Sequence, residues 1–388
     1  MRLPREVWVL VVARAVNRLG AFTLPFLSVT LVQAFGASVV QAGWLLSAFG
    51  LATIPSRLLG GRLADRLGRR TTILVGLLGT ALAQLALAAA PTLLVAGAAA
   101  VALGLVFEVY EPPSQALLAD VTTRAQRPAA FGLMAGAMAA AGMAAGLLAA
   151  AVAGVDLRWL FVVDAGTCLA CAVLVGLTLS GEVVPTAGPP AAGARRDPRL
   201  LAMLGAGTVF ALVYLQITIA VPLTLLARDL PVARTGILLT VSAATIVLGQ
   251  PLLRLLRPVE SFRALALGYV LLAAGLFATG FVTSLAGFVA GTVLWSLGDL
   301  VLLGRAYAVV SELVPAGRRG GYLAAYGTSW GVAAVLAPLV GTGLLARGGP
   351  PLLWSVLALL CLGLAAAQPV VRRVVSAGAP PATAAARP

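Results

Sequence analysis

Long apolar runs dominate this sequence and constrain what it can fold into. A helix of about 20 apolar residues crosses the roughly 30 Å hydrocarbon core of a bilayer, and twelve runs reach that length. A stretch rich in Pro, Gly and charge, residues 181–199, separates the sixth run from the seventh. We therefore predict an all-α integral membrane protein with twelve transmembrane helices, at about residues 7–34, 39–60, 71–90, 92–119, 129–154, 158–180, 200–227, 234–256, 262–284, 286–312, 320–346 and 351–371.

The composition supports a membrane protein and excludes several other classes. Only 10% of the 388 residues are charged, against about a quarter in a soluble domain. The net charge of +14 would suggest nucleic acid in a soluble protein. Here the arginines are spread over short connections, so no nucleic-acid partner is expected. There is no His, so any proton carrier has to be a carboxylate. Cys168 and Cys171 are expected to be small core residues, and neither a metal site nor a cofactor is predicted.

The distribution of arginine predicts the orientation. If the N-terminus is cytoplasmic, nineteen of the 27 cationic residues, all of them Arg, fall on the cytoplasmic side, four fall on the other side and four lie within the runs. Positive residues concentrate in cytoplasmic loops. Both termini are therefore predicted to be cytoplasmic. The expected location is a bacterial inner membrane, where the chain spans the lipid bilayer many times, and a monomer is the default for this architecture.

The two sets of six runs resemble each other. The string Gly43-Trp-Leu-Leu-Ser in the second run returns as Gly236-Ile-Leu-Leu-Thr in the eighth. Two parallel repeats with a site between them are typical of alternating-access carriers. We predict an N-terminal six-helix bundle over residues 1–180, a cytoplasmic linker over 181–199, a C-terminal six-helix bundle over 200–371 and a disordered tail over 372–388.

The connection between the second and third runs carries a specific motif. It reads Gly60-Gly-Arg-Leu-Ala-Asp-Arg-Leu-Gly-Arg-Arg70, and the spacing G-x-L-A-D-R-x-G-R-R resembles the signature loop of the major facilitator superfamily. The strings Asn17–Leu27 and Glu111-Pro112-Pro113 resemble bacterial efflux members, the drug:proton antiporters. The Gly-Pro-x-x-Gly motif of those antiporters is absent from the fifth run, where Leu147 follows Gly146.

The resemblance implies a gating role for the signature loop, which comprises Gly61, Asp65, Arg66, Gly68, Arg69 and Arg70. By the resemblance, Asp65 would contact the start of the eleventh helix near Gly320, and Arg69 would pair with Asp120. These contacts would hold the cytoplasmic side shut and break when that side opens.

Candidate proton carriers are the carboxylates inside the runs. Glu108 and Glu111 are three residues apart, and Gln115 follows Glu111 by four, so a continuous helix would place all three on one face. Two close carboxylates in a low dielectric do not both ionise cheaply, which favours proton binding. The alternative is that one or both neutralise Arg14, Arg18 or Arg305 in a static ion pair. Asp299 in the tenth run is a further candidate.

Other polar residues inside the runs are candidates for a central cavity, because the membrane would otherwise exclude them. Arg14, Asn17 and Arg18 form a polar stripe on the first helix, where snorkelling is the alternative for Arg18. Tyr214 and Gln216 are possible cavity contacts, and Arg305 is a possible counter-ion across the repeat interface.

These features favour a secondary active transporter and not an enzyme. We predict a proton-coupled exporter of small organic or amphipathic compounds that works by alternating access. Uptake of a nutrient or metabolite by symport or uniport is the first alternative. A membrane sensor or scaffold that does not transport is the second.

Overall fold

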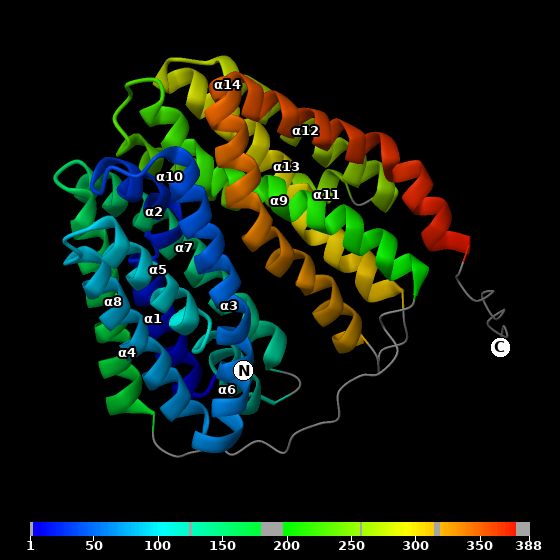
Figure 1. Cartoon of the computed structure of the whole chain (residues 1–388). Helices are drawn as coiled ribbons and strands as arrows, with labels where there is room; N and C mark the ends of the chain where they lie inside the picture. Colours follow the sequence, from blue (N-terminus) through cyan, green and yellow to red (C-terminus); the bar gives the residue numbers. More distant parts are fainter. Residues whose placement is uncertain (1–2, 124–125, 180–196, 257, 314–318, 378–388) are drawn as a thin grey trace, which may run out of the picture.

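The computed structural model describes residues 3–123, 126–179, 197–256, 258–313 and 319–377, and all regular structure in them is helical (Figure 1). Each apolar run forms a helix because no water is available in a bilayer to satisfy its backbone groups. The first half contains α1 (Arg5–Leu19), α2 (Thr23–Gln33), α3 (Val39–Leu67), α4 (Arg69–Ala88), α5 (Leu93–Phe107), α6 (Glu111–Asp120), α7 (Arg127–Ala153) and α8 (Leu157–Thr178).

The second half begins with a long helix that Asp197 caps at its N-terminus. It contains α9 (Pro198–Leu226), α10 (Arg234–Gly249), α11 (Leu252–Leu255), α12 (Ser261–Phe281), α13 (Leu285–Glu312) and α14 (Arg319–Ala377). Within α14 the backbone leaves the helical region at Gly348 and Gly349. This break separates the predicted eleventh and twelfth runs.

Ten helices of the described residues are long and apolar enough to cross a membrane, and α10 is a shorter apolar helix. One of the ten, residues 325–376, covers two predicted runs on either side of the glycine break. The chain is thus a multi-pass membrane protein. Twelve crossings and two cytoplasmic termini stay predictions.

Two predicted boundaries are wrong. Helix α3 continues to Leu67, so most of the expected signature loop is helical, and only Gly68, with φ 82°, turns the chain into α4. At the C-terminus α14 runs to Ala377, so residues 372–377 are helical and not part of a disordered tail. The rest of that tail and most of the predicted linker lie outside the described residues.

The helices form two groups, α1–α8 and α9–α14, that lean together at one end and diverge toward the end where the N-terminus lies (Figure 1). Three pairs of helices join the groups: α3 packs on α14, α7 on α10 and α2 on α9. If the halves are superposed as repeats, the α3–α14 and α10–α7 contacts are equivalent.

The equivalent contacts use the repeated string. Gly43 lies against Thr342 of α14, and Gly236 lies against Gly146 of α7, both too closely for a side chain. Four residues further on, the Ser47 hydroxyl donates to the Val335 carbonyl over 2.7 Å.

In the same way, the Thr240 hydroxyl donates to the Met143 carbonyl over 3.0 Å. These two Gly-x-x-x-Ser/Thr contacts, which we name the seal, join the halves at the end away from the N-terminus.

Candidate functional site

A cavity of about 810 Å³ lies between the two groups of helices, below the seal. Its lining comes from both halves, and most of it is apolar or aromatic. The apolar lining includes Leu24, Leu46, Phe49, Ile54, Leu58, Phe107, Leu215, Ile219, Trp330 and Val332. The polar lining includes Thr53, Thr218, Thr328 and Tyr307, and the charged side chains are Arg57 and Glu108. Such a cavity is large enough for a drug-sized molecule.

The two charged side chains of the cavity form an ion pair. The Arg57 Nη2 lies 3.1 Å from the Glu108 Oε2. The Arg57 side chain is 60% exposed, whereas that of Glu108 is 23% exposed. The backbone N–H of Glu108 also donates to the Ser56 hydroxyl over 3.0 Å. Glu108 is therefore the more shielded member of the pair, and Arg57 is the member more open to water.

Glu108 reaches the cavity because the helix breaks beside it. Pro112 and Pro113 stand in the first turn of α6 and have no N–H to donate to the carbonyls of Glu108 and Val109. The freed Val109 carbonyl lies so close to Gly60 of α3 that a side chain there would overlap it. The break and the glycine together bring Glu108 against α3.

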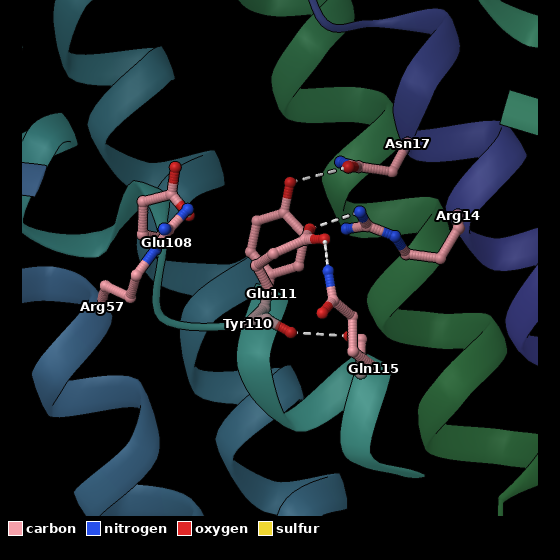
Figure 2. A network of polar contacts seen from close by, with 8 residues as sticks. Arg14, Asn17, Arg57, Glu108, Tyr110, Glu111 and Gln115 are labelled. Atoms are coloured by element: carbon pink, nitrogen blue, oxygen red, sulfur yellow. Dashed lines mark hydrogen bonds and ion pairs between the residues drawn. The ribbon is translucent and has the colours of Figure 1, made fainter. Parts of the chain in front are cut away.

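Glu111 lies on the other side of this break. Arg14 of α1 donates to the Glu111 carboxylate, and the Gln115 amide donates to it over 2.8 Å (Figure 2). The Arg14 guanidinium also lies over the Tyr110 ring, 5.2 Å from its centroid. The predicted Glu111–Gln115 proximity is confirmed.

The predicted common face for Glu108 and Glu111 is wrong. Figure 2 shows Glu108 directed toward Arg57 and Glu111 directed toward Arg14. The prediction assumed a continuous helix, and the break turns the two carboxylates apart. In this structure Glu111 pairs with Arg14, one of the partners that the ion-pair alternative named, whereas Glu108 pairs with Arg57, which it did not name. Sequence reasoning missed Arg57, although a charge inside an apolar run was an available signal.

Asn17 is not a cavity residue, contrary to the prediction. It is buried and accepts a hydrogen bond from the Tyr110 hydroxyl over 2.9 Å. Its amide donates to the Cys168 sulfur over 3.2 Å, and Cys168 approaches Asp164 within 3.9 Å. Asp164 also accepts from the Gln84 amide over 2.6 Å. This chain of contacts holds α1, α4 and α8 together behind the Glu111 site.

Asp299 is the most isolated carboxyl group in the described spanning helices. It is completely buried, and neither of its oxygens has a hydrogen-bond partner. Its charge acts on Tyr214 of α9 and on Cys361 of α14, so it lies among the helices of the second half. The Tyr214 ring in turn packs against Trp330, 5.1 Å between centroids, and Trp330 lines the cavity.

Arg18 has an exposed side chain in the last turn of α1. Its Nε lies 3.7 Å from where a side chain would begin on Gly142 of α7. Gly142 lies one helical turn before Gly146, where α7 contacts α10, so Arg18 lies near the boundary between the halves. The described residues supply no hydrogen-bond or ion-pair partner for it. Arg14, by contrast, is directed toward Glu111.

Two further predicted roles are wrong. Gln216 is completely buried and donates to the Ala337 carbonyl, so it joins α9 to α14 and does not line the cavity. Arg305 donates to the carbonyls of Leu256 and Val259, where it caps the segment after α11. It is not a counter-ion across the repeat interface.

The signature stretch makes part of the expected set of contacts. Arg69 pairs with Asp120 at the end of α6, as the resemblance implied. Arg70 donates to the Gly176 carbonyl of α8 over 2.6 Å. Asp65 and Arg66 are exposed, and Gly61 has open space around it.

One expected consequence is wrong. The Arg69–Asp120 pair is intact although the halves diverge at this end, so it does not break on opening. It joins two helices of the same half. Among the described residues, no cluster of three His, Cys, Asp or Glu side chains is suited to a metal ion.

Comparison with known proteins decides the family. The model of the Major Facilitator Superfamily matches residues 10–257, more than half of the chain. The chain belongs to this superfamily. This chain is 25% identical over 385 residues to the MFS-type transporter YqjV of Bacillus subtilis (strain 168), and the match covers 92% of this chain and 91% of YqjV. It is 26% identical over 362 residues to YhjO of the same organism, covering 88% and 86%.

Solved structures share the fold of this protein at low sequence identity. A POT family transporter in complex with 5-aminolevulinic acid superposes with a TM-score of 0.80 at 12% identity, covering 95% of this chain and 97% of that one. A bacterial homologue of the human lysosomal transporter Spinster, in an inward-facing and occupied conformation, gives 0.70 at 15% identity, covering 96% and 95%. The family and its two curated relatives make this protein a membrane transporter and not an enzyme.

Proposed function

We propose that this protein exports small organic or amphipathic compounds in exchange for protons, by alternating access. The observation that carries the proposal is the cavity between the halves, which both halves line and which the seal closes at one end. A carrier needs such a site, because tilting the halves exposes it to either side of the membrane in turn.

The cavity wall supports amphipathic substrates. Leucine, isoleucine and aromatic side chains make up most of it, and a few hydroxyls and one ion pair interrupt it. Burial of apolar surface supplies non-directional affinity of about 25 cal/mol per Å². A polar group of the compound would then hydrogen-bond to Thr53, to Thr328 or to the Arg57–Glu108 pair.

Glu108 is our first candidate for the proton carrier. It is the carboxylate of the cavity lining, and its ion-pair partner Arg57 is the more exposed of the two. A proton on Glu108 would release Arg57 and change the charge of the cavity from zero to +1. A proton and a cationic compound therefore oppose each other's binding, as exchange requires. Glu111, which already accepts from Arg14 and Gln115, is the second candidate.

The proposed orientation indicates to which side of the membrane this structure is open. The count of arginines places the N-terminus in the cytoplasm. The halves diverge toward that same end (Figure 1). The structure would then be open to the cytoplasm, ready to receive a compound for export across the bacterial inner membrane as a monomer.

We also propose that the signature stretch acts in gating. Asp65 is exposed in this open state, and it would contact the N-terminus of α14 when the cytoplasmic end closes, since helix N-termini favour anions. Asp65→Asn should slow transport at equal amounts in the membrane. Asp229→Asn, the same change at an exposed site between α9 and α10, is the matched control. A normal rate in Asp65→Asn contradicts the gating role.

Symport of a metabolite is a second candidate, and Arg18 and Asp299 favour it. An ionised Asp299 would attract Arg18 across the cavity, whereas a protonated Asp299 leaves Arg18 open to an anion. Membrane interiors penalise an unpaired charge by about 2.5–3.5 kcal/mol or more, so we expect the buried Asp299 to hold a proton here. A proton and an anionic compound would then favour each other's binding.

Proton movement in liposomes tests the function. Purified protein is reconstituted with an internal pH dye and exposed to lipophilic cations, antibiotics and small metabolites. Exchange predicts that a compound gradient drives protons the opposite way, and that Glu108→Gln abolishes proton movement. Glu111→Gln is the paired variant. Protons moving with the compound, and lost in Asp299→Asn, would establish symport instead. Compound flux without proton movement would contradict both.

A further inference from the structure

The arginines inside the spanning helices differ in their partners. Four of them were counted above as lying within the predicted runs. Arg14 pairs with Glu111, and Arg57 pairs with Glu108. Arg305 donates to two backbone carbonyls. Arg18 alone of these four has no partner among the described residues, although it lies one helical turn after Arg14.

The described carboxylates of the spanning helices do not pair with Arg18. Glu108 and Glu111 are each committed to another arginine. Asp164 accepts from Gln84 deep behind α1. Asp299 is completely buried in the other half and makes no hydrogen bond. The ion pairs cancel, so the guanidinium of Arg18 leaves the space between the halves with a net positive charge.

The position of Arg18 makes this charge accessible. Its side chain is exposed, and its Nε lies against Gly142 of α7, one helical turn before the contact of Gly146 with α10. Tyr214 is partly exposed and packs edge-on against Trp330, which lines the cavity. The space between the halves thus offers a free guanidinium in addition to the aromatic wall of the cavity.

We propose that Arg18 is an anion-binding residue, which binds a carboxylate, sulfonate or phosphate group of the transported compound. A cleft with one sign of charge and low-dielectric walls concentrates ions of the opposite sign. The planar guanidinium offers paired N–H donors that match such groups. The proposal rests on the second transport function proposed above, symport of a metabolite, and narrows its substrates to amphipathic compounds with an anionic group and an apolar or aromatic body.

A pair of probes that differ only in charge tests this. Binding of 1-naphthoate and 1-naphthamide to the purified full chain in nanodiscs is measured by equilibrium dialysis at low and high salt. We expect the wild type to prefer naphthoate by about 10-fold to 100-fold, the range of a hydrogen bond to a charged group. The preference should shrink at high salt.

Variants separate charge from folding. Arg18→Gln should bind both probes equally and naphthamide as the wild type does, which shows that it is folded. Arg18→Lys should keep part of the preference. Arg62→Gln, the same change at an exposed arginine near the end of α3, is the matched control and should keep all of it.

The outcomes are distinct from those of the transport assay. No preference for naphthoate in the wild type, or an unchanged preference in Arg18→Gln, overturns the proposal for Arg18. If compound-driven flux persists in that case, the transport proposal stands. If no compound of the panel is moved while naphthoate binding depends on Arg18, the transport proposal fails and the anion site remains.

Discussion

Single residues decide how the carboxylates of the first half behave. The helix break before Pro112 separates Glu108 from Glu111, and each then finds its own arginine. The Arg14 and Glu111 side chains are only 13% and 26% exposed, so this pair is shielded from water. Removing one member leaves a poorly solvated charge.

The Arg14–Glu111 pair should therefore show coupling. Arg14→Gln and Glu111→Gln should each lower stability by about 1–3 kcal/mol, the penalty for an unsatisfied buried polar group. The double variant should lose less than the sum of the two. The measurement is thermal unfolding of the purified protein in detergent. Strictly additive losses would show that the two side chains do not stabilise each other.

Asp197 should give the fold a dependence on acid pH. Its pKa lies below the ordinary value, mainly because Arg199 donates to it and also because the Tyr322 hydroxyl does, over 2.9 Å. The stabilisation is complete above the unfolded pKa of about 3.9 and is lost as the pH falls through the lower folded pKa.

Asp197→Asn keeps a capping side chain but loses the charge that attracts Arg199. We expect it to cost about 1 kcal/mol at pH 7 and pH 5, with a smaller difference from wild type at about pH 3, which is below the unfolded pKa of about 3.9. Melting temperatures at these three pH values check this. A difference that grows as the pH falls would have the wrong sign.

At the scale of helices, the seal depends on glycine. Gly236 and Gly146 bring α10 and α7 so close that a side chain on either would overlap the other backbone. Gly43 of α3 lies against the Thr342 hydroxyl of α14, so a side chain at residue 43 would overlap Thr342. The repeated string of the sequence thus has one function in both halves, which its spacing alone did not reveal.

Gly146→Val should force the seal apart and shift the protein toward opening at that end. The matched control is Gly136→Val on the same helix, where no atom lies within 4 Å of the added carbon. Reaction of a cysteine introduced at Ser47 with a water-soluble maleimide, in a background without native cysteines, measures the opening. Equal reaction rates in the two variants would contradict this role of Gly146.

Periodicity predicted most of the helices but not their irregularities. The first residues of α3, α4, α8 and α12 lie within a few residues of the first residues of the predicted runs. The helix break beside Glu111 could be predicted from Pro112 and Pro113, which have no N–H groups, but the divergence of Glu108 and Glu111 across that break was missed. The extension of α3 through Gly60–Leu67 was also missed. The partner Arg57 was missed as well, since it faces Glu108 only once the helix breaks.

At the scale of the whole molecule, the sequence predicted two related halves and a central site. It did not predict which end of the molecule is closed. Which end is closed depends on contacts between helices far apart in sequence, such as Ser47 with Val335. No local pattern encodes the balance between these contacts and those of the opposite state. The prediction that the Arg69–Asp120 pair breaks on opening was wrong, because both residues lie in the same half.

The central claim is that the two halves tilt about the cavity, so that one end closes as the other opens. Distances between spin labels in nanodiscs test it most directly. One pair of labels at Arg66 and Glu312 reports on the open end, and a second pair at Val155 and Asp229 reports on the sealed end. All four positions are exposed.

A transported compound or a change of pH should shorten the first distance and lengthen the second in the same molecules. This opposite change is the result that alternating access predicts. Two distances that stay fixed under every condition in which the protein transports, or that lengthen together, would contradict it.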